Sequence, residues 1–314
     1  MTILLILAGL GGLLLGTRWT LNGALQLASR YGLSNSFVGI GILAVGTDFP
    51  ELFVSLRGAL LELNGVDSSG IVAGNALGSC VSNIVLVLGL AAIVVPVRIH
   101  WFEFKRDGAA LVISVLVLFL FSLDGVVSRE EGAVLLLLYI AYFIWFVRSA
   151  PVIHPPTTKK KAESAASAVM LLVVGLLVLV SASQLVVTNA ITLSGQLGVE
   201  QSLVGATIVG LGTSLPEAAV SIGAGLRGKT EMAVGNIIGS NIFNALVLIG
   251  LSGVMATTAV DRTLLFVDFP MLLVLTALVL LMIRAKRGLG KAGGGLLVFL
   301  YLIYVAVSYF ASAA

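Results

Sequence analysis

The chain has 314 residues, of which 59% are hydrophobic and only 11% are charged. Soluble domains carry about 25% charged residues, so this composition excludes an ordinary soluble protein and indicates an integral membrane protein. Cys80 is the single cysteine, which excludes a disulfide framework and a cysteine-based metal site.

A helix that crosses a bilayer needs about 20 mainly apolar residues. In chain order, ten such runs cover residues 2–27, 36–61, 69–95, 105–123, 131–149, 167–193, 199–225, 230–257, 263–283 and 291–311. The N-terminus lacks the basic region of a secretory signal peptide, so we expect the first run to be the first span. The predicted fold class is an all-α integral membrane protein with ten transmembrane helices.

The basic residues indicate how these helices are oriented. Of the 18 Lys and Arg residues, 14 fall in the odd-numbered connections between spans. Basic loops stay in the cytoplasm, so we expect a protein of the cell membrane with both termini outside and the Pro- and Lys-rich linker 150–166 inside. The formal net charge of +3 is then a topology signal, and it does not indicate a nucleic-acid partner.

The two halves of the chain resemble each other. Residues 38–60 agree with 204–226 at ten of 23 positions, and 74–90 agree with 235–251 at seven of 17. Each half holds five spans, an odd number, so the second copy enters the membrane from the opposite side. Inverted repeats of this kind recur among secondary transporters, whose substrate sites lie near the bilayer midplane. The expected units are a first repeat at 1–149 with its motifs at 36–95, the linker 150–166, and a second repeat at 167–314 with its motifs at 199–257.

Each repeat carries a proline where a membrane helix is expected. Pro50 has no N–H, so the carbonyl of Gly46 loses its helical partner, and Pro216 has the same effect on Gly212. In lipid, such a carbonyl is tolerated only beside protein or a hydrated cavity. These two freed carbonyls are therefore candidate cation ligands.

Three carboxylates, Asp48, Glu51 and Glu217, lie in the same stretches. Each would cost about 2.5–3.5 kcal/mol at the bilayer centre, and no Lys, Arg or His lies at comparable depth in these helices. Their charge must be neutralised by protons or by cations from solution. Further oxygen ligands at helical spacing come from Thr47, Ser79, Asn83, Thr213, Ser214, Ser240 and Asn244. Carboxylate, amide, hydroxyl and carbonyl oxygens form the ligand set of Ca²⁺, and Na⁺, which is hard and similar in size, can share it.

The pairing of GTDFPE with GTSLPE, and of GNALGSCVSN with GNIIGSNIFN, resembles the α-repeats of the cation/calcium exchanger superfamily, in particular those of its prokaryotic sodium/calcium exchanger branch. The resemblance implies that Glu51 and Glu217 bind Ca²⁺. It also implies that the first and sixth helices slide across the others to switch access. The residues that would help to hold Na⁺ or Ca²⁺ are Thr47, Ser79, Asn83, Thr213, Ser214, Ser240 and Asn244.

Asp48 departs from the usual Gly-Thr-Ser-x-Pro-Glu motif, and some relatives place an aspartate where Asn244 stands. Compared with those relatives, the third carboxylate has moved from the second repeat to the first, and the formal charge of the site stays near −3. The alternative is that Asp48 points into a water-filled vestibule. The departure bears on ion stoichiometry and selectivity more than on the general function.

These observations predict an antiporter that exchanges Na⁺ for Ca²⁺ by alternating access. We expect it to work as a monomer in the lipid bilayer, without a cofactor and without enzymatic activity. A proton/calcium antiporter, a potassium-dependent exchanger and an exchanger of another divalent cation stay open, because buried carboxylates also titrate readily. A passive channel is the alternative from a different class.

Overall fold

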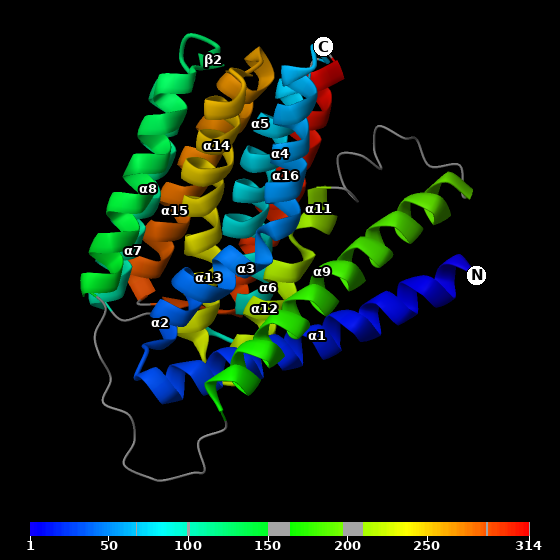
Figure 1. The fold of residues 1–314 in the computed structure, drawn as a ribbon, viewed down its shortest axis with the longest axis vertical. Coiled ribbons are helices and arrows are strands. Elements are labelled where there is room, and N and C mark those ends of the chain that lie inside the picture. The colour runs from blue at the N-terminus through cyan, green and yellow to red at the C-terminus, as the bar shows by residue number, and fades with distance from the viewer. Residues whose placement is uncertain (67, 99–100, 150–163, 197–209, 287, 314) are drawn as a thin grey trace.

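The computed structural model describes residues 1–66, 68–98, 101–149, 164–196, 210–286 and 288–313. Over these ranges the chain is a bundle of helices with four very short strands (Figure 1), which confirms the all-α, multi-span fold class. Most of the linker predicted at 150–166 lies outside the described residues. The beginning of the span predicted at 199–225 lies outside them as well.

The described helices follow the ten predicted spans in order. In the first half they are α1 (Thr2–Tyr31), α2 (Asn35–Val38), α3 (Val45–Thr47), α4 (Phe49–Leu63), α5 (Ser69–Val81), α6 (Leu88–Val94), α7 (Trp101–Phe121) and α8 (Arg129–Ser149). In the second half they are α9 (Ala165–Gln196), α11 (Gly210–Thr213), α12 (Leu215–Leu226), α13 (Thr230–Phe243), α14 (Ile249–Met255), α15 (Phe269–Lys286) and α16 (Lys291–Ala313).

Wider, π-helical turns interrupt several spans. They are η1 (Gly39–Ala44), η2 (Ser82–Val87), η4 (Asn244–Leu248) and η5 (Leu264–Asp268). The turns η2 and η4 occupy matching places in the two halves, since η2 joins α5 to α6 and η4 joins α13 to α14. Such turns are often found at functional sites.

Seven helices among the described residues are long and apolar enough to cross a bilayer. An eighth span results when Asn35–Thr47 and Phe49–Leu63, which are bent by 47° relative to each other, are counted as one. The two other predicted spans correspond to α7, which begins with several charged residues, and to α11 with α12, whose described part is short.

Two short strand pairs relate the halves to each other. The strands are β1 (Val97–Arg98), β2 (Val126–Val127), β3 (Thr258–Ala259) and β4 (Gly288–Leu289). Strands β1 and β3 follow the equivalent helices α6 and α14, yet β1 pairs with β4 and β2 pairs with β3. The two ladders lie at opposite ends of α7. This exchange of partners is the arrangement expected of two oppositely oriented repeats.

Helices of the two halves also pack against each other in this crossed way, and glycines stand at both contacts. Gly132 of α8 packs against α14, where a Cβ would lie 2.7 Å from the carbonyl oxygen of Gly250. Gly89 of α6 packs against α16, where a Cβ would lie 3.0 Å from the carbonyl oxygen of Gly294. Small residues let membrane helices approach closely, which is what both crossings require.

Helices α1 and α9 pack side by side and run at an angle across the other helices (Figure 1). A Cβ at Gly16 of α1 would lie 2.7 Å from the backbone nitrogen of Leu179 in α9. The rest of the bundle centres on the spans Gly70–Val94 and Thr230–Met255, in whose apolar stretches 72% and 83% of the residues are buried, compared with 17% in α1 and α8. The two central spans therefore provide the packed interior in which polar side chains are shielded from lipid.

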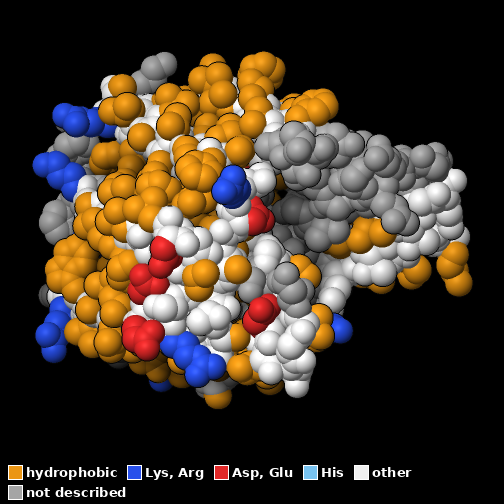
Figure 2. Space-filling view, turned by 90° about the horizontal axis from the view of Figure 1, so that it is seen from above, with side chains coloured by type: hydrophobic (Ala, Val, Ile, Leu, Met, Phe, Trp, Pro, Cys, Tyr) orange, Lys and Arg blue, Asp and Glu red, His pale blue; other side chains and the backbone are white. Residues whose placement is uncertain are grey.

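The two ends of the bundle differ in charge. The end with β1 and β4 is mainly basic, since Arg98, Lys105, Arg148, Lys229, Arg284 and Lys291 outnumber acids such as Asp107 and Glu231. The end with β2 and β3 carries acidic as well as basic residues, including Asp124, Arg129, Glu130, Glu131 and Asp261. Figure 2 looks onto this second end and shows red and blue side chains among hydrophobic ones. We call the first end the basic end.

Candidate cation-binding site

Both repeats break one helix at the same motif. Asp48 separates α3 from α4 with φ −76° and ψ 3°, and Ser214 separates α11 from α12 with φ −83° and ψ 5°. Pro50 and Pro216 follow in the first turns of α4 and α12. Because proline supplies no N–H, the helical ladder is interrupted in the preceding turn. The predicted breaks are therefore present in both halves.

The two glutamates lie in the first turns of the helices that begin after the breaks. Glu51 is in the first turn of α4, and Glu217 is in the first turn of α12. The positive end of a helix dipole stabilises an acidic side chain there by about 0.3–1 kcal/mol, and up to about 2 kcal/mol when it is partly buried. This contribution offsets only part of the cost of placing a charge inside the bundle.

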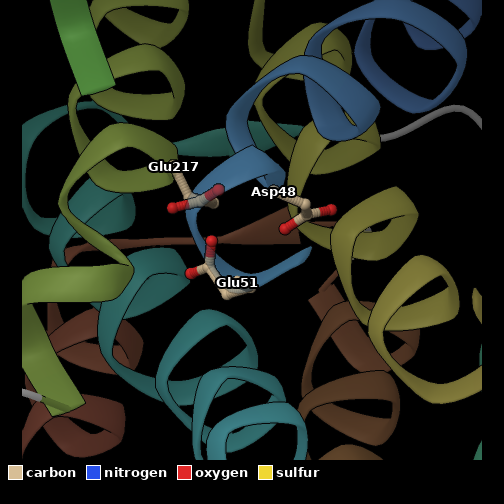
Figure 3. A group of neighbouring side chains, drawn as sticks. All are labelled: Asp48, Glu51 and Glu217. Carbon is tan, nitrogen blue, oxygen red and sulfur yellow. The ribbon is translucent and has the colours of Figure 1, made fainter. Parts of the chain in front are cut away.

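The structure brings the three predicted carboxylates together. One oxygen atom from each of Asp48, Glu51 and Glu217 can be chosen so that all three lie within 4.8 Å of one another. All three residues have no exposed surface. Figure 3 shows Glu51 and Glu217 facing each other across a small space, with Asp48 at its side. The site thus combines acidic side chains from both halves of the chain.

These carboxylates differ from the other buried acids among the described residues. Asp107 binds Arg106 through two contacts, of 2.6 Å and 3.1 Å, and Asp268 accepts hydrogen bonds from Tyr304 at 2.7 Å and from Ser308 at 3.1 Å. By contrast, all six oxygen atoms of Asp48, Glu51 and Glu217 lack a hydrogen-bond partner. Buried polar groups normally have partners, so a group with none points to a ligand.

The electrostatics of the cluster favour a cation. At 4.8 Å and an effective dielectric constant of about 20, each pair of carboxylates repels by about 3.5 kcal/mol. Oxygen ligands lie about 2.3–2.6 Å from a bound Ca²⁺, so oxygens on opposite sides of the ion lie about 5 Å apart. The observed separation allows all three carboxylates to share one ion. The attraction of each carboxylate to such a cation would exceed the repulsion between the carboxylates.

Three of the predicted neutral ligands lie next to this cluster. Ser240 lies beside Asp48, Ser79 beside Glu51, and Thr47 beside Glu217. The Ser79 and Thr213 hydroxyl oxygens are 3.5 Å apart, which links α5 to α11. Among the predicted ligands, the hydroxyls of Ser214 and Ser240 and the side-chain amides of Asn83 and Asn244 are buried without a hydrogen-bond partner.

Asn75 and Asn236 stand one helical turn before Ser79 and Ser240, but they bind groups on the neighbouring helices α4 and α12. Asn75 donates to the backbone carbonyl of Glu51 at 3.1 Å and to the hydroxyl of Ser55 at 3.3 Å. Asn236 donates to the hydroxyl of Ser221 at 3.1 Å in the second half. These matched bonds connect α5 to α4 and α13 to α12. They position the helices that carry the two glutamates.

Ser183 of α9 is a site residue that the sequence motifs do not reveal. Its hydroxyl donates a 2.8 Å hydrogen bond to the carbonyl of Gly212, one of the two carbonyls freed by proline. No motif could identify Ser183, because α9 lies outside the repeated motifs and reaches Gly212 only through tertiary packing.

The glycines before the breaks also have a packing role. A Cβ at Gly46 would lie 2.6 Å from Cδ1 of Leu176, and a Cβ at Gly212 would overlap Val187. Both neighbours belong to α9. Glycine at these two positions therefore lets α9 approach both helix breaks closely.

A cavity of about 370 Å³ lies between α4 and α9 and reaches the break in the second half. Its lining includes Pro50, Arg57, Ser183, Gln184, Gly212 and Thr213. Thr213, which lines this cavity, contacts Ser79 beside Glu51, so the cavity lies next to the carboxylate site.

Comparisons with known proteins agree on one family. The family model described as "Sodium/calcium exchanger protein" matches residues 1–148 and 167–310. The chain is 32% identical over 293 residues to the "Putative antiporter CaxA" of Alkalimonas amylolytica, covering 90% of each protein. It is 27% identical to the "Sodium/calcium exchanger MaX1" of Methanosarcina acetivorans over 98% of each. A solved structure of the sodium-calcium exchanger NCX_Mj matches with a TM-score of 0.83 and 30% identity over 97% of this chain and 98% of that one.

These matches span nearly the whole chain, and they extend from its sequence to its fold. The chain therefore belongs to the sodium/calcium exchanger protein family and is a multi-pass membrane transporter rather than an enzyme.

Proposed function

We propose that this protein exchanges Na⁺ for Ca²⁺ across the cell membrane at the buried site formed by Asp48, Glu51 and Glu217. The observation that carries the proposal is the convergence of three carboxylates, without hydrogen-bond partners, from both halves of the chain. Ca²⁺ would take one oxygen from each carboxylate. Neutral oxygens from Thr47, Thr213, Ser214, Ser79, Ser240, Asn83 and Asn244, with the freed carbonyls of Gly46 and Gly212, would complete the shells of Ca²⁺ and Na⁺.

Competition for shared oxygens would couple the two fluxes. A Ca²⁺ ion leaves a −3 site with about one negative charge, whereas several Na⁺ ions neutralise the same cluster. Because both cations need Glu51 and Glu217, they cannot fill the site together. Alternating access of this site to the two sides then converts a gradient of one ion into transport of the other.

The proposal also includes the division of the chain into repeats and its orientation in the membrane. We propose inverted repeats at 1–149 and 167–314, with both termini outside and the linker 150–166 in the cytoplasm. The concentration of Lys and Arg at the basic end supports this orientation, because basic loops stay inside. A single chain contributes all three carboxylates, which supports a monomer as the working unit.

The test is transport in proteoliposomes. Vesicles loaded with Na⁺ and diluted into Na⁺-free buffer should take up radioactive Ca²⁺, and Glu51→Gln or Glu217→Gln should abolish this uptake. Asp268→Asn is the matched control, because Asp268 is a buried acid whose partners are Tyr304 and Ser308. Full uptake in both glutamine variants would reject the site.

The same vesicles distinguish the alternatives. Ca²⁺ uptake driven by a pH gradient alone would identify a proton/calcium antiporter. A requirement for K⁺ would identify a potassium-dependent exchanger, and preference for another divalent ion would change the cargo. Ca²⁺ flux without an obligatory counter-ion would indicate a channel.

A further inference from the structure

Helices α1 and α9 hold equivalent places in the two halves, and they pack on each other symmetrically. Gly9 of α1 recurs as Gly175 of α9, at the displacement of 166 residues that also relates the two proline motifs. A Cβ at Gly9 would lie 2.6 Å from Cγ2 of Val186 in α9. A Cβ at Gly175 would overlap the backbone of Thr20 in α1, which is the equivalent of Val186 at the same displacement. The two helices therefore form a pair that is symmetric within itself.

The contacts of this pair with the rest of the bundle are not symmetric. At both helix breaks, Gly46 and Gly212 pack against α9. The α9 residue at the second break is Val187, whose equivalent in α1 is Leu21. Leu21 packs against α12, where its Cδ1 lies 3.1 Å from the position of a Cβ at Gly223. In this structure, α9 thus supports both breaks, while α1 supports the helix that follows the second one.

The same asymmetry separates two equivalent hydroxyl groups. Ser183 of α9 donates a 2.8 Å hydrogen bond to the freed carbonyl of Gly212. Its equivalent in α1 is Thr17, which is only 8% exposed, and the Thr17 hydroxyl has no hydrogen-bond partner. Cγ2 of Thr17 lies 2.6 Å from the position of a Cβ at Gly223 in α12. Buried polar groups normally have partners, so the unpaired Thr17 hydroxyl points to another state in which it is bonded.

Equivalent residues of α4 and α12 differ in exposure in the corresponding way. Val54 of α4 lines the cavity between α4 and α9 and is 36% exposed, whereas its equivalent in α12, Val220, is fully buried. Helix α4 leads to the end with β2 and β3, and α12 leads to the basic end. There, Nη1 of Arg227 donates to Oδ1 of Asn22 at 2.7 Å and joins the end of α12 to α1. The path beside α4 is open, and the equivalent path beside α12 is closed.

We propose that Thr17 is a positioning residue that takes over the role of Ser183 when the site opens toward the basic end. In that state, α1 would support the first break, and the Thr17 hydroxyl would donate to the freed carbonyl of Gly46. Ser183 would leave its own carbonyl and move against Arg57, closing the cavity that both residues now line. This inference rests on the proposed function, because it describes the two states between which the exchanger alternates.

The exchange of hydroxyls would let the two states have similar free energies. A carbonyl freed by proline has no helical donor, and such groups inside a membrane protein need other partners. Each state would provide one hydroxyl–carbonyl bond of the same type, so switching would break one bond and form its equivalent. Bound ions can then decide which state is populated, since a ligand shifts an equilibrium only by its difference in affinity for the two states.

Cysteine labelling from each side of the membrane tests this exchange without measuring transport. In chains carrying Cys80→Ser, a single reporter is introduced as Val54→Cys or Val220→Cys, and a membrane-impermeant methanethiosulfonate is applied to the side on which that path opens. The ratio of the Val54→Cys rate to the Val220→Cys rate reports the balance of the two states. Thr17→Val should raise this ratio about fivefold, as expected for the loss of one hydrogen bond in the other state. Ser183→Ala should lower it about fivefold.

Thermal unfolding in detergent separates this role from a purely structural one. Ser183→Ala breaks a bond that is present and should lower the melting temperature, whereas Thr17→Val should not, because the Thr17 hydroxyl has no partner here. Thr20→Val is the matched control for labelling. Thr20 is also a buried threonine of α1 whose hydroxyl has no partner, but it faces Gly175 of α9, so its substitution should leave the ratio unchanged.

An unchanged ratio in Thr17→Val, or a change no larger than that in Thr20→Val, would overturn the proposal. A shift in the same direction in Thr17→Val and Ser183→Ala would overturn it as well. If the ratio shifts as expected while no ion exchange is found, the role of Thr17 stands and the proposed transport function fails. If vesicles exchange Na⁺ for Ca²⁺ and the ratio stays constant, the transport function stands and the role of Thr17 is refuted.

Discussion

Replacing Asp48 by asparagine tests whether this residue binds the ion, because the change removes a charge and keeps the shape. With a ligand distance of about 2.4 Å and an effective dielectric constant of about 20, the Asp48 carboxylate attracts Ca²⁺ by about 14 kcal/mol and Na⁺ by about 7 kcal/mol. Without a cation, the charge of these buried carboxylates is neutralised by protons, so their repulsion arises only when the ion binds. The same change relieves that repulsion by Glu51 and Glu217, about 3.5 kcal/mol each at 4.8 Å, or about 7 kcal/mol in all.

The two terms nearly cancel for Na⁺ and leave a net loss of about 7 kcal/mol for Ca²⁺. The amide oxygen of asparagine still coordinates, and it recovers part of this loss. We therefore expect Asp48→Asn to weaken Ca²⁺ binding at least about a hundredfold, which corresponds to about 3 kcal/mol, and Na⁺ binding less than about fivefold.

Isothermal titration with Ca²⁺ at several Na⁺ concentrations measures both effects. The Na⁺ affinity follows from how strongly Na⁺ shifts the apparent Ca²⁺ affinity. Asp268→Asn is the control. Asp268 is a buried acid that accepts hydrogen bonds from Tyr304 and Ser308, so its substitution should leave the Ca²⁺ affinity unchanged. A Ca²⁺ affinity within threefold of wild type in Asp48→Asn would refute the reasoning and favour a vestibule position for Asp48.

Three further predictions concern the surroundings of the site. Ser183→Ala removes the donor to the Gly212 carbonyl and should lower the free energy of unfolding by about 1 kcal/mol, measured by thermal or denaturant unfolding in detergent; wild-type stability would contradict this. Arg57→Gln removes a positive charge from the cavity between α4 and α9 and should speed Ca²⁺ entry more than Na⁺ entry at low ionic strength. Equal changes for both ions would argue against entry through this cavity. Asn236→Ala breaks the hydrogen bond to Ser221 and should reduce the free energy of unfolding by about 1–2 kcal/mol, whereas calorimetry should still show one bound Ca²⁺. Loss of all Ca²⁺ binding would indicate that Asn236 is a ligand.

Much of the architecture could be predicted because lipid imposes simple rules on sequence. Spans need long apolar runs, and the described helices follow the predicted runs within a few residues wherever both ends are described. The convergence of Glu51 and Glu217 followed from repetition of one motif, since equivalent residues in inverted repeats meet at the axis between them.

The features that the sequence did not reveal depend on tertiary contacts. The π-helical turns at η2 and η4 have no sequence signal of their own, although they carry Asn83 and Asn244. Ser183 belongs to a helix without any repeated motif, and its role depends on the approach of α9 to Gly212. The pairing of Arg106 with Asp107 and its contact with Phe146 likewise required knowing that α7 begins where α8 ends.

The contacts of α9 give a physical reason why access and ion binding would be coupled in the proposed exchange. Leu176 lies against Gly46 in the first break, and Val187 lies against Gly212 in the second. These two side chains are about 16 Å apart along one helix, at 1.5 Å per residue. A displacement of α9 along its axis would therefore press on both breaks at once, and it would carry Ser183 away from the Gly212 carbonyl. Because the same breaks position Asp48, Glu51 and Glu217, a movement of α9 would change the arrangement of the oxygens in the proposed ion site.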